Sequence, residues 1–91
     1  MNSIIVEKPT NEKLEELGVS GWPIWEKEIS KFSWTYDSQE TCYILEGRAT
    51  VEPEDGEGVE FSAGDFVTFP EGLRCIWNIT SPIKKHYKFG G

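Results

Sequence analysis

Gly64-Asp65-Phe66-Val67-Thr68-Phe69-Pro70-Glu71-Gly72 is the stretch of this sequence that decides the fold. Residues 66–69 are aromatic or β-branched, as residues in strands tend to be, and turn-forming residues flank them on both sides. Gly64 reaches the positive φ angles of a tight turn without steric cost, and Pro70 followed by Gly72 favours a tight corner. A short strand between two tight turns is typical of an antiparallel barrel or sandwich.

Short β-like segments separated by turn residues continue along the rest of the chain. Residues 12–17 are the exception, because their pattern predicts a helical turn that is capped by Thr10 or Asn11 and ended by Gly18. Asp55-Gly56 predicts a hairpin turn within the loop 53–58. The predicted strands cover residues 3–8, 25–29, 32–36, 41–45, 49–52, 59–61, 66–69, 74–80 and 83–89. We therefore predict an all-β sandwich or barrel of eight or nine strands with one short N-terminal helical turn, in a single domain over residues 1–91.

The balance of charges excludes several kinds of partner. Sixteen acidic and nine basic residues give a net charge of −7, whereas nucleic-acid binding needs clustered Lys and Arg. We expect no nucleic-acid partner and no attraction to an anionic membrane surface. No apolar run approaches the ~20 residues of a transmembrane helix, and the first residues lack a signal-peptide pattern.

The cysteines indicate a reducing compartment. Cys42 and Cys75 are too few for a disulfide framework and lack the CxxC spacing of redox sites. We therefore predict a cytoplasmic location, while a plastid location would require that a transit peptide has been removed.

Two segments of the sequence resemble the paired motifs of the cupin superfamily. The first motif, G-x5-H-x-H-x(3,4)-E-x6-G, is matched at its Glu and its last Gly by residues 40–47. The second motif, G-x5-P-x-G-x2-H-x3-N, is matched at every fixed position of its first half by residues 64–72. The resemblance implies a small cupin, or jelly-roll, β-barrel with its core at about residues 25–89. Residues 22–25, 40–43, 72–75 and 85–87 are also similar to short cupins related to the cupin domain of (S)-ureidoglycine aminohydrolase, a manganese-dependent hydrolase.

The resemblance also shows which metal ligands this chain lacks. The two first-motif histidine positions hold Trp34 and Tyr36, the motif Glu is kept as Glu40, and the second-motif histidine position holds Cys75. The chain has one histidine, His86, so no site with two or three histidines forms within a monomer. We expect no cofactor. If a divalent metal ion binds, Glu40 and Cys75 are the expected ligands. Tyr36 would then be a further oxygen ligand and Cys42 a further sulfur ligand.

Strand parity predicts what fills the barrel instead. Residues of one parity share a face of a strand, and on the last strand this rule leaves Lys84, His86 and Lys88 toward solvent. The predicted lining of the interior comprises Trp34, Tyr36, Glu40, Cys42, Cys75, Trp77, Lys85 and Tyr87. Two interpretations fit this set: a packed aromatic core, or a small-molecule pocket with aromatic walls and a few polar groups.

Three functions remain open at this point, and whether the chain is an enzyme stays open with them. The first is a cupin barrel that binds a small organic molecule without a histidine-held metal. The second is a metal-dependent hydrolase similar to ureidoglycine aminohydrolase, and the third is a non-catalytic homodimerisation module in which Trp22 and Trp25 cover a barrel edge or a dimer face. Cys75 is a candidate nucleophile if Lys85 lowers the pKa of its thiol.

Overall fold

Strands make up most of the computed structural model, which describes residues 4–54 and 56–90. The elements in chain order are β1 (Ile5–Glu7), α1 (Asn11–Leu17), the 3-10 helix η1 (Val19–Gly21), β2 (Ile24–Lys27), β3 (Ser30–Thr35), β4 (Glu40–Pro53), β5 (Val59–Ser62), β6 (Phe66–Phe69) and β7 (Arg74–Phe89). The predicted all-β fold with one short helix near the N-terminus is confirmed. None of the helices in the described ranges is long and apolar enough to cross a membrane.

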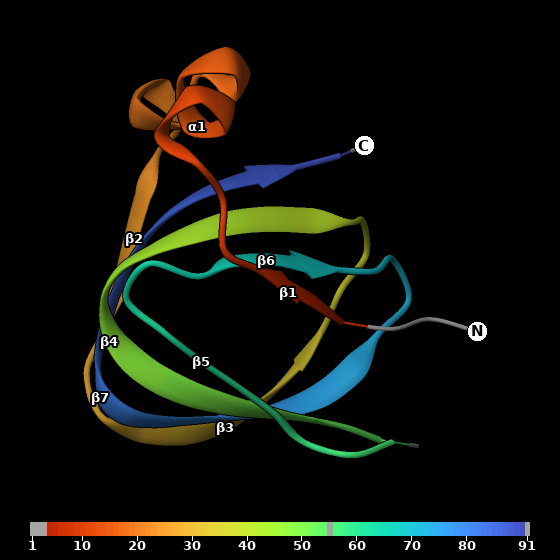
Figure 1. The fold of residues 1–91 in the computed structure, drawn as a ribbon. Coiled ribbons are helices and arrows are strands. Elements are labelled where there is room, and N and C mark those ends of the chain that lie inside the picture. The colour runs from red at the N-terminus through yellow and green to blue at the C-terminus, as the bar shows by residue number, and fades with distance from the viewer. Residues whose placement is uncertain (1–3, 55, 91) are drawn as a thin grey trace.

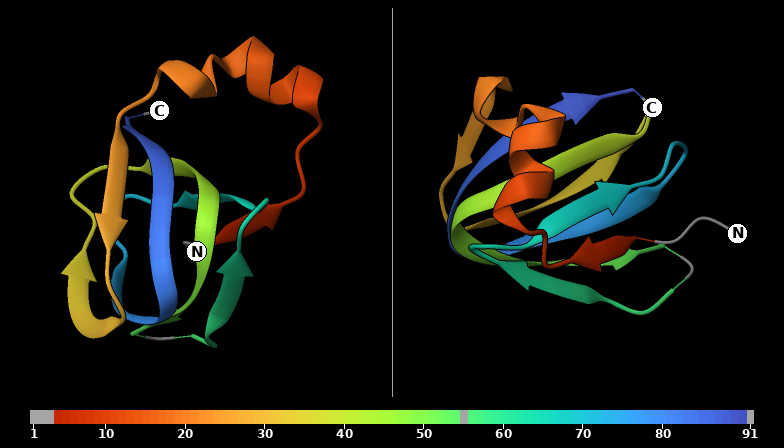
Figure 2. Two further views of the ribbon diagram at one scale, coloured as in Figure 1. Left: turned by 90° about the vertical axis from the view of Figure 1, so that its left-hand side faces the viewer. Right: turned by 45° about the horizontal axis from the view of Figure 1, so that its top comes forward.

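The strands form one curled antiparallel sheet. Its order is β1-β6-β4-β7-β2, with β3 also paired to β7 and β5 also paired to β4. β4 and β7 pair with each other from Glu40↔Phe89 to Pro53↔Cys75, and both bend sharply along their length, so that the sheet wraps around an interior (Figure 1). The turned views show α1 and η1 outside the curled strands, at one end (Figure 2).

The segment from Gly64 to Gly72 forms the turn, strand and corner that its sequence predicts. β6 spans Phe66–Phe69, and the two glycines that flank it have φ angles of +95° and +84°. The carboxylate of Asp65 accepts a hydrogen bond from the backbone N–H of Ser62 at 2.8 Å, which ties the first turn together. Leu73 N–H donates to the carbonyl of Pro70 at 3.3 Å and closes the corner.

The two longest strands correct the predicted strand count. Residues 41–45 and 49–52 belong to the single strand β4, and residues 74–80 and 83–89 belong to the single strand β7, so the described ranges contain seven strands. Gly47 does not end its strand but bends it, with a φ of +95°, and the pairing register shifts on both sides of it. A Cβ at Gly47 would lie 2.0 Å from the carbonyl oxygen of Pro82 on β7. Only glycine allows the two bent strands to approach so closely.

The N-terminal helix has the predicted caps. The Thr10 side chain accepts a hydrogen bond from Lys13 N–H at 3.1 Å, so Thr10 rather than Asn11 is the N-cap. Gly18 ends the helix in the left-handed conformation, with φ +70°. β4 and β5 pair across the predicted hairpin, while Asp55 of its turn and Ser3 of the predicted first strand lie outside the described residues.

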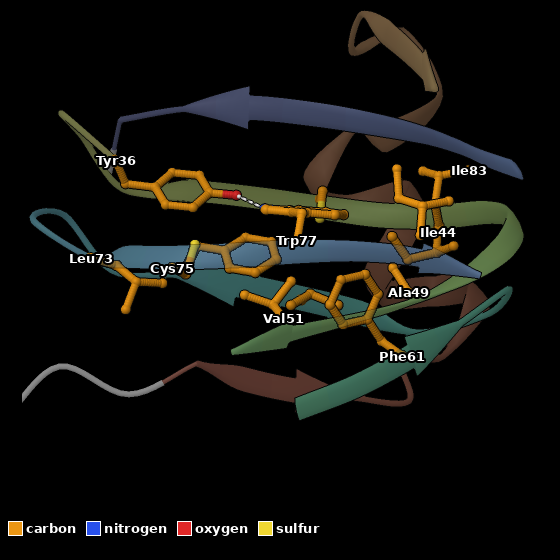
Figure 3. Packing of buried hydrophobic residues seen from close by; sticks show 13 residues of the cluster. Tyr36, Ile44, Ala49, Val51, Phe61, Leu73, Cys75, Trp77 and Ile83 are labelled. Atoms are coloured by element: carbon orange, nitrogen blue, oxygen red, sulfur yellow. Dashed lines mark hydrogen bonds between the residues drawn. The ribbon is translucent and has the colours of Figure 1, made fainter. Parts of the chain in front are cut away.

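Aromatic rings dominate the interior. Tyr36 stacks on Phe69 with ring centroids 5.0 Å apart, and Phe61 meets Trp77 edge to face at 5.4 Å. Both arrangements are favoured by the ring quadrupoles and add ~0.5–1.5 kcal/mol per pair to the burial of apolar area. Figure 3 shows Tyr36, Phe61 and Trp77 between the curled strands. The apolar core comprises Tyr36, Cys42, Ile44, Ala49, Val51, Phe61, Val67, Phe69, Leu73, Cys75, Trp77, Ile79 and Ile83.

Candidate functional site

The barrel interior is not filled completely: beside the apolar core lies a cavity of about 240 Å³. Two of its nine lining residues are charged and the other seven are aromatic. The lining comprises Trp25, Phe32, Trp34, Tyr36, Glu40, Trp77, Lys85, Tyr87 and Phe89. Six of the eight residues predicted from strand parity are therefore brought together around one cavity, and the remaining two, Cys42 and Cys75, are not.

The charged pair of this cavity is a buried ion pair. Lys85 Nζ lies 2.7 Å from Glu40 Oε2, and the two side chains are 5% and 4% exposed. Glu40 opens β4 and Lys85 lies on β7, which is the neighbouring strand, and parity turns both side chains inward. Removing two opposite charges from water costs several kcal/mol, and good geometry only partly repays that cost.

Aromatic faces surround the ammonium group of Lys85. Its Nζ lies 4.8 Å from the ring centroid of Trp77, 4.9 Å from that of Trp25 and 5.9 Å from that of Phe69. Ring faces are negative, so they attract a cation that has lost its water. The aromatic residues thus stabilise the charged lysine and also form the apolar wall of the cavity.

Tyr36 connects the ion pair to the apolar core. Its hydroxyl accepts a hydrogen bond from Trp77 Nε1 at 3.3 Å, which Figure 3 shows as a dashed line. Burial, followed by the nearby Glu40 carboxylate and the hydrogen bond to it, raises the pKa of Tyr36 far above its ordinary value. Tyr36 is therefore a neutral phenol at physiological pH, able to donate a hydrogen bond to Glu40 and unable to act as a phenolate base.

The two predicted cysteines lie in the apolar core rather than on the cavity. Both are free thiols, and Cys42 is fully buried. Burial is the largest cause that raises the pKa of Cys42 to about 12 and that of Cys75 to about 11. For Cys42 the Lys85 ammonium partly offsets the effect of burial on the pKa, and the Glu40 carboxylate contributes to the rise at both thiols. Cys75 Sγ lies 3.6 Å from the carbonyl oxygen of Trp34. Thiols with such pKa values stay protonated at neutral pH, which disfavours Cys75 as a nucleophile or a metal ligand.

The structure adds Trp25, Phe32 and Phe89 to the predicted lining. Phe32 shares its parity with Trp34 on β3 and with Tyr36 just after the strand, so the alternation rule was sufficient to find it. Trp25 lies directly opposite Lys85 in the pairing of β2 with β7. That pairing joins residues 60 positions apart in the sequence, and no local pattern reveals it.

The outward face of β7 is less exposed than predicted. Ile83 and Lys85 are buried, as expected, and Lys88 is exposed. Lys84 is half-buried, with its Nζ 3.9 Å from the Glu46 carboxylate. His86 is also half-buried instead of solvent-facing. Its Nδ1 lies 2.9 Å from the carbonyl oxygen of Trp22, since the segment that leads into β2 covers this part of the strand.

The donor atoms of the cavity do not fit a metal ion. At the two positions where the resemblance places histidines, Trp34 offers no lone pair for coordination and Tyr36 is a buried neutral phenol. Glu40 is the one strong donor of the motif that remains, and the Lys85 ammonium already lies on its oxygen. Within the described ranges, no three His, Cys, Asp or Glu side chains gather in a way that could hold a metal ion.

Comparison with known proteins places the chain among the cupins. The sequence model of the EutQ-like cupin domain matches residues 14–87. A crystal structure of a DUF861 family protein from Thermotoga maritima is 56% identical, with a TM-score of 0.94, and the match covers 96% of this chain and 99% of that one. No curated protein matches the chain.

More distant structures share the fold alone. The EutQ protein of Clostridium difficile is 21% identical with a TM-score of 0.68, and the match covers 98% of this chain and 68% of that one. The oxalate decarboxylase of Lactobacillus farciminis, solved as a formate complex, is 16% identical with a TM-score of 0.58, and the match covers 99% of this chain and 29% of that one.

Proposed function

The chain belongs to the EutQ-like cupin domain family, and from this premise we propose that it binds a small organic molecule in the barrel cavity without a histidine-held metal ion. The buried Glu40–Lys85 pair beside an aromatic cavity is the observation that carries this proposal. Ligand sites are concave and mostly apolar, with a few converging polar groups that orient the ligand. The cavity has this composition.

Stability alone does not account for the ion pair. Replacing a buried ion pair by apolar side chains of similar volume is often neutral or stabilising. A barrel that served only as a packed module would be at least as stable with two apolar residues at positions 40 and 85. Two charged groups beside an open cavity match instead the few converging polar groups of a ligand site.

The alternative of a manganese-dependent hydrolase similar to ureidoglycine aminohydrolase is not favoured by the geometry. Manganese prefers oxygen ligands, and in this cavity the carboxylate of Glu40 is already paired with Lys85 at 2.7 Å. We therefore derive no reaction step through a metal. The homodimer predicted from the sequence stays a prediction, which light scattering tests.

A thermal-shift screen of small metabolites tests the proposal. We expect at least one uncharged or weakly polar metabolite to raise the melting temperature of the wild-type protein, because a ligand that binds only the folded state stabilises it. The shift should persist with excess chelator and should shrink in Glu40→Gln. The matched control is Glu46→Gln, on the same strand but 69% exposed, which should keep the full shift. No shift with any metabolite, a shift that requires metal, or a shift that is equal in both variants would contradict the proposal.

A further inference from the structure

The charge balance of the cavity restricts what it can bind. Glu40 and Lys85 contribute one negative and one positive charge, 2.7 Å apart and both more than nine-tenths buried. The other described lining residues are all uncharged aromatics. A ligand with a net charge would leave one of three buried charges without a partner, and an unpaired buried charge is strongly unfavourable. The cavity therefore favours an uncharged ligand.

The walls favour a flat ligand. The ring of Phe32 stacks on that of Trp77 with an angle of 6° between their planes and 6.1 Å between centroids. Trp34 and Phe89, also on the cavity, remain 47% and 48% exposed. Flat rings gain both burial and favourable ring geometry against such walls. A flat guest would also cover the apolar area that Trp34 and Phe89 leave open.

The hydrogen-bonding groups favour an acceptor on the ligand. An ammonium group has three N–H donors, and Lys85 directs one of them to Glu40. The rings of Trp25 and Trp77 lie beside the ammonium, and a ring face is a weaker acceptor than a carbonyl oxygen. Glu40 already accepts from Lys85 through Oε2, so the two remaining N–H groups of Lys85 are left to donate to an acceptor on the ligand.

Building on the proposed function, we propose that the cavity takes an uncharged, flat molecule whose carbonyl oxygen or ring nitrogen accepts a hydrogen bond from Lys85. The Glu40 carboxylate, 2.7 Å from the ammonium group, then acts as its internal counter-ion, so that the site has no net charge. The ring faces of Trp25 and Trp77 lie against the ammonium group of Lys85.

Three probes of one shape test this inference. Benzamide is neutral, benzoate is an anion and benzamidinium is a cation, and all three are flat rings with a planar substituent of similar size. Titration calorimetry of each into the wild-type protein should show benzamide binding at least about tenfold tighter than both ions, a difference of about 1.4 kcal/mol. Changes of the indole N–H resonances of Trp25 and Trp77 should locate the binding in the cavity.

Each result of this series is informative. If benzoate or benzamidinium binds in the cavity as tightly as benzamide, the charge inference is overturned while the proposed binding function stands. If none of the three changes the indole resonances, the inference is overturned, and the metabolite screen decides the proposed function separately.

In two variants we expect an ion, rather than benzamide, to bind most tightly of the three probes. Glu40→Gln leaves the Lys85 cation without its counter-ion, so this variant should prefer benzoate. Lys85→Met leaves the carboxylate, so it should prefer benzamidinium. Glu46→Gln should keep the wild-type order. An unchanged order in folded Glu40→Gln and Lys85→Met overturns the inference, and if either variant fails to fold, the wild-type series alone decides it.

Discussion

Two regions of the barrel share the same strands but have opposite chemistry. In the apolar core, β4 contributes Ile44, Ala49 and Val51, which are fully buried among other apolar side chains. In the cavity, β4 contributes Glu40, and the interior is open and holds an ion pair. Trp77 contacts both regions, meeting Phe61 at 5.4 Å on the core side and the Lys85 ammonium at 4.8 Å on the cavity side. The comparison indicates that the core provides the stability that allows the cavity to stay polar and unfilled.

The largest expected effect lies in the core. Phe61→Ala should lower the free energy of unfolding by about 3–5 kcal/mol, because the side chain is 1% exposed and its removal leaves a cavity among rigid neighbours. Urea unfolding measures the change. A loss below about 1 kcal/mol would contradict the assignment of stability to the core.

The ion pair should respond differently to single and double substitution. Lys85→Met leaves the Glu40 carboxylate buried without its cation, and we expect the free energy of unfolding to fall by about 3 kcal/mol. The double variant Glu40→Gln/Lys85→Met has no unpaired charge and should be within about 1 kcal/mol of wild type, or more stable. A double variant that is less stable than Lys85→Met would show that the pair serves the fold itself.

The buried thiols predict a loss of stability at alkaline pH. Burial raises the pKa of Cys42 and Cys75 from the ordinary 9.0 to about 12 and about 11, so the folded state holds both protons more tightly than the unfolded state does. Their stabilisation is therefore complete below pH 9 and is lost as the pH rises toward 11 to 12. At pH 10 each thiol should cost about 1 kcal/mol relative to pH 7, from the factor of 1.36 kcal/mol per pKa unit.

Denaturant midpoints between pH 7 and 10 measure this loss. The control is the double variant Cys42→Ala/Cys75→Ala, whose stability should fall less over the same interval. If both proteins lose the same stability, the thiols are not the cause.

The smallest effect on stability, with a clear effect on binding, is expected at the edge of the cavity. Trp34→Ala should change the free energy of unfolding by less than about 1 kcal/mol, since the side chain is 47% exposed. The same change removes an aromatic wall and should weaken benzamide binding several-fold. A matched control is Ile76→Ala, 40% exposed and not on this cavity, which should leave the affinity unchanged.

The sequence predicted the fold better than it predicted the lengths of the strands. Glycine and proline punctuation around residues 66–69 is local chemistry, and it located β6 and its two turns correctly. Gly47 looked like a strand end because glycine usually marks one. It is instead a bend, which is understood only once Pro82 of β7 is known to lie against it. Contacts between residues far apart in the sequence leave no local signal.

In the candidate site, too, the sequence predicted what depends on local pattern and not what depends on contacts between distant residues. The alternation of side chains along each strand was sufficient to predict that Glu40, Trp77 and Lys85 point into the barrel, where all three are buried. Parity does not distinguish a side chain on the cavity from one inside the core, so Cys42 and Cys75 were grouped with the lining. Trp25 was missed because only the pairing of β2 with β7 brings it beside Lys85.

The central claim is that the Glu40–Lys85 pair serves ligand binding rather than folding. Calorimetric titration of benzamide, with chelator present, into wild type and the Glu40→Gln/Lys85→Met double variant tests it most directly, with the unfolding free energy of each sample measured alongside. We expect wild type to bind and the double variant to bind at least about tenfold more weakly, a loss of about 1.4 kcal/mol, while its free energy of unfolding stays within about 1 kcal/mol of wild type or rises. Equal affinity in the two proteins would contradict the claim.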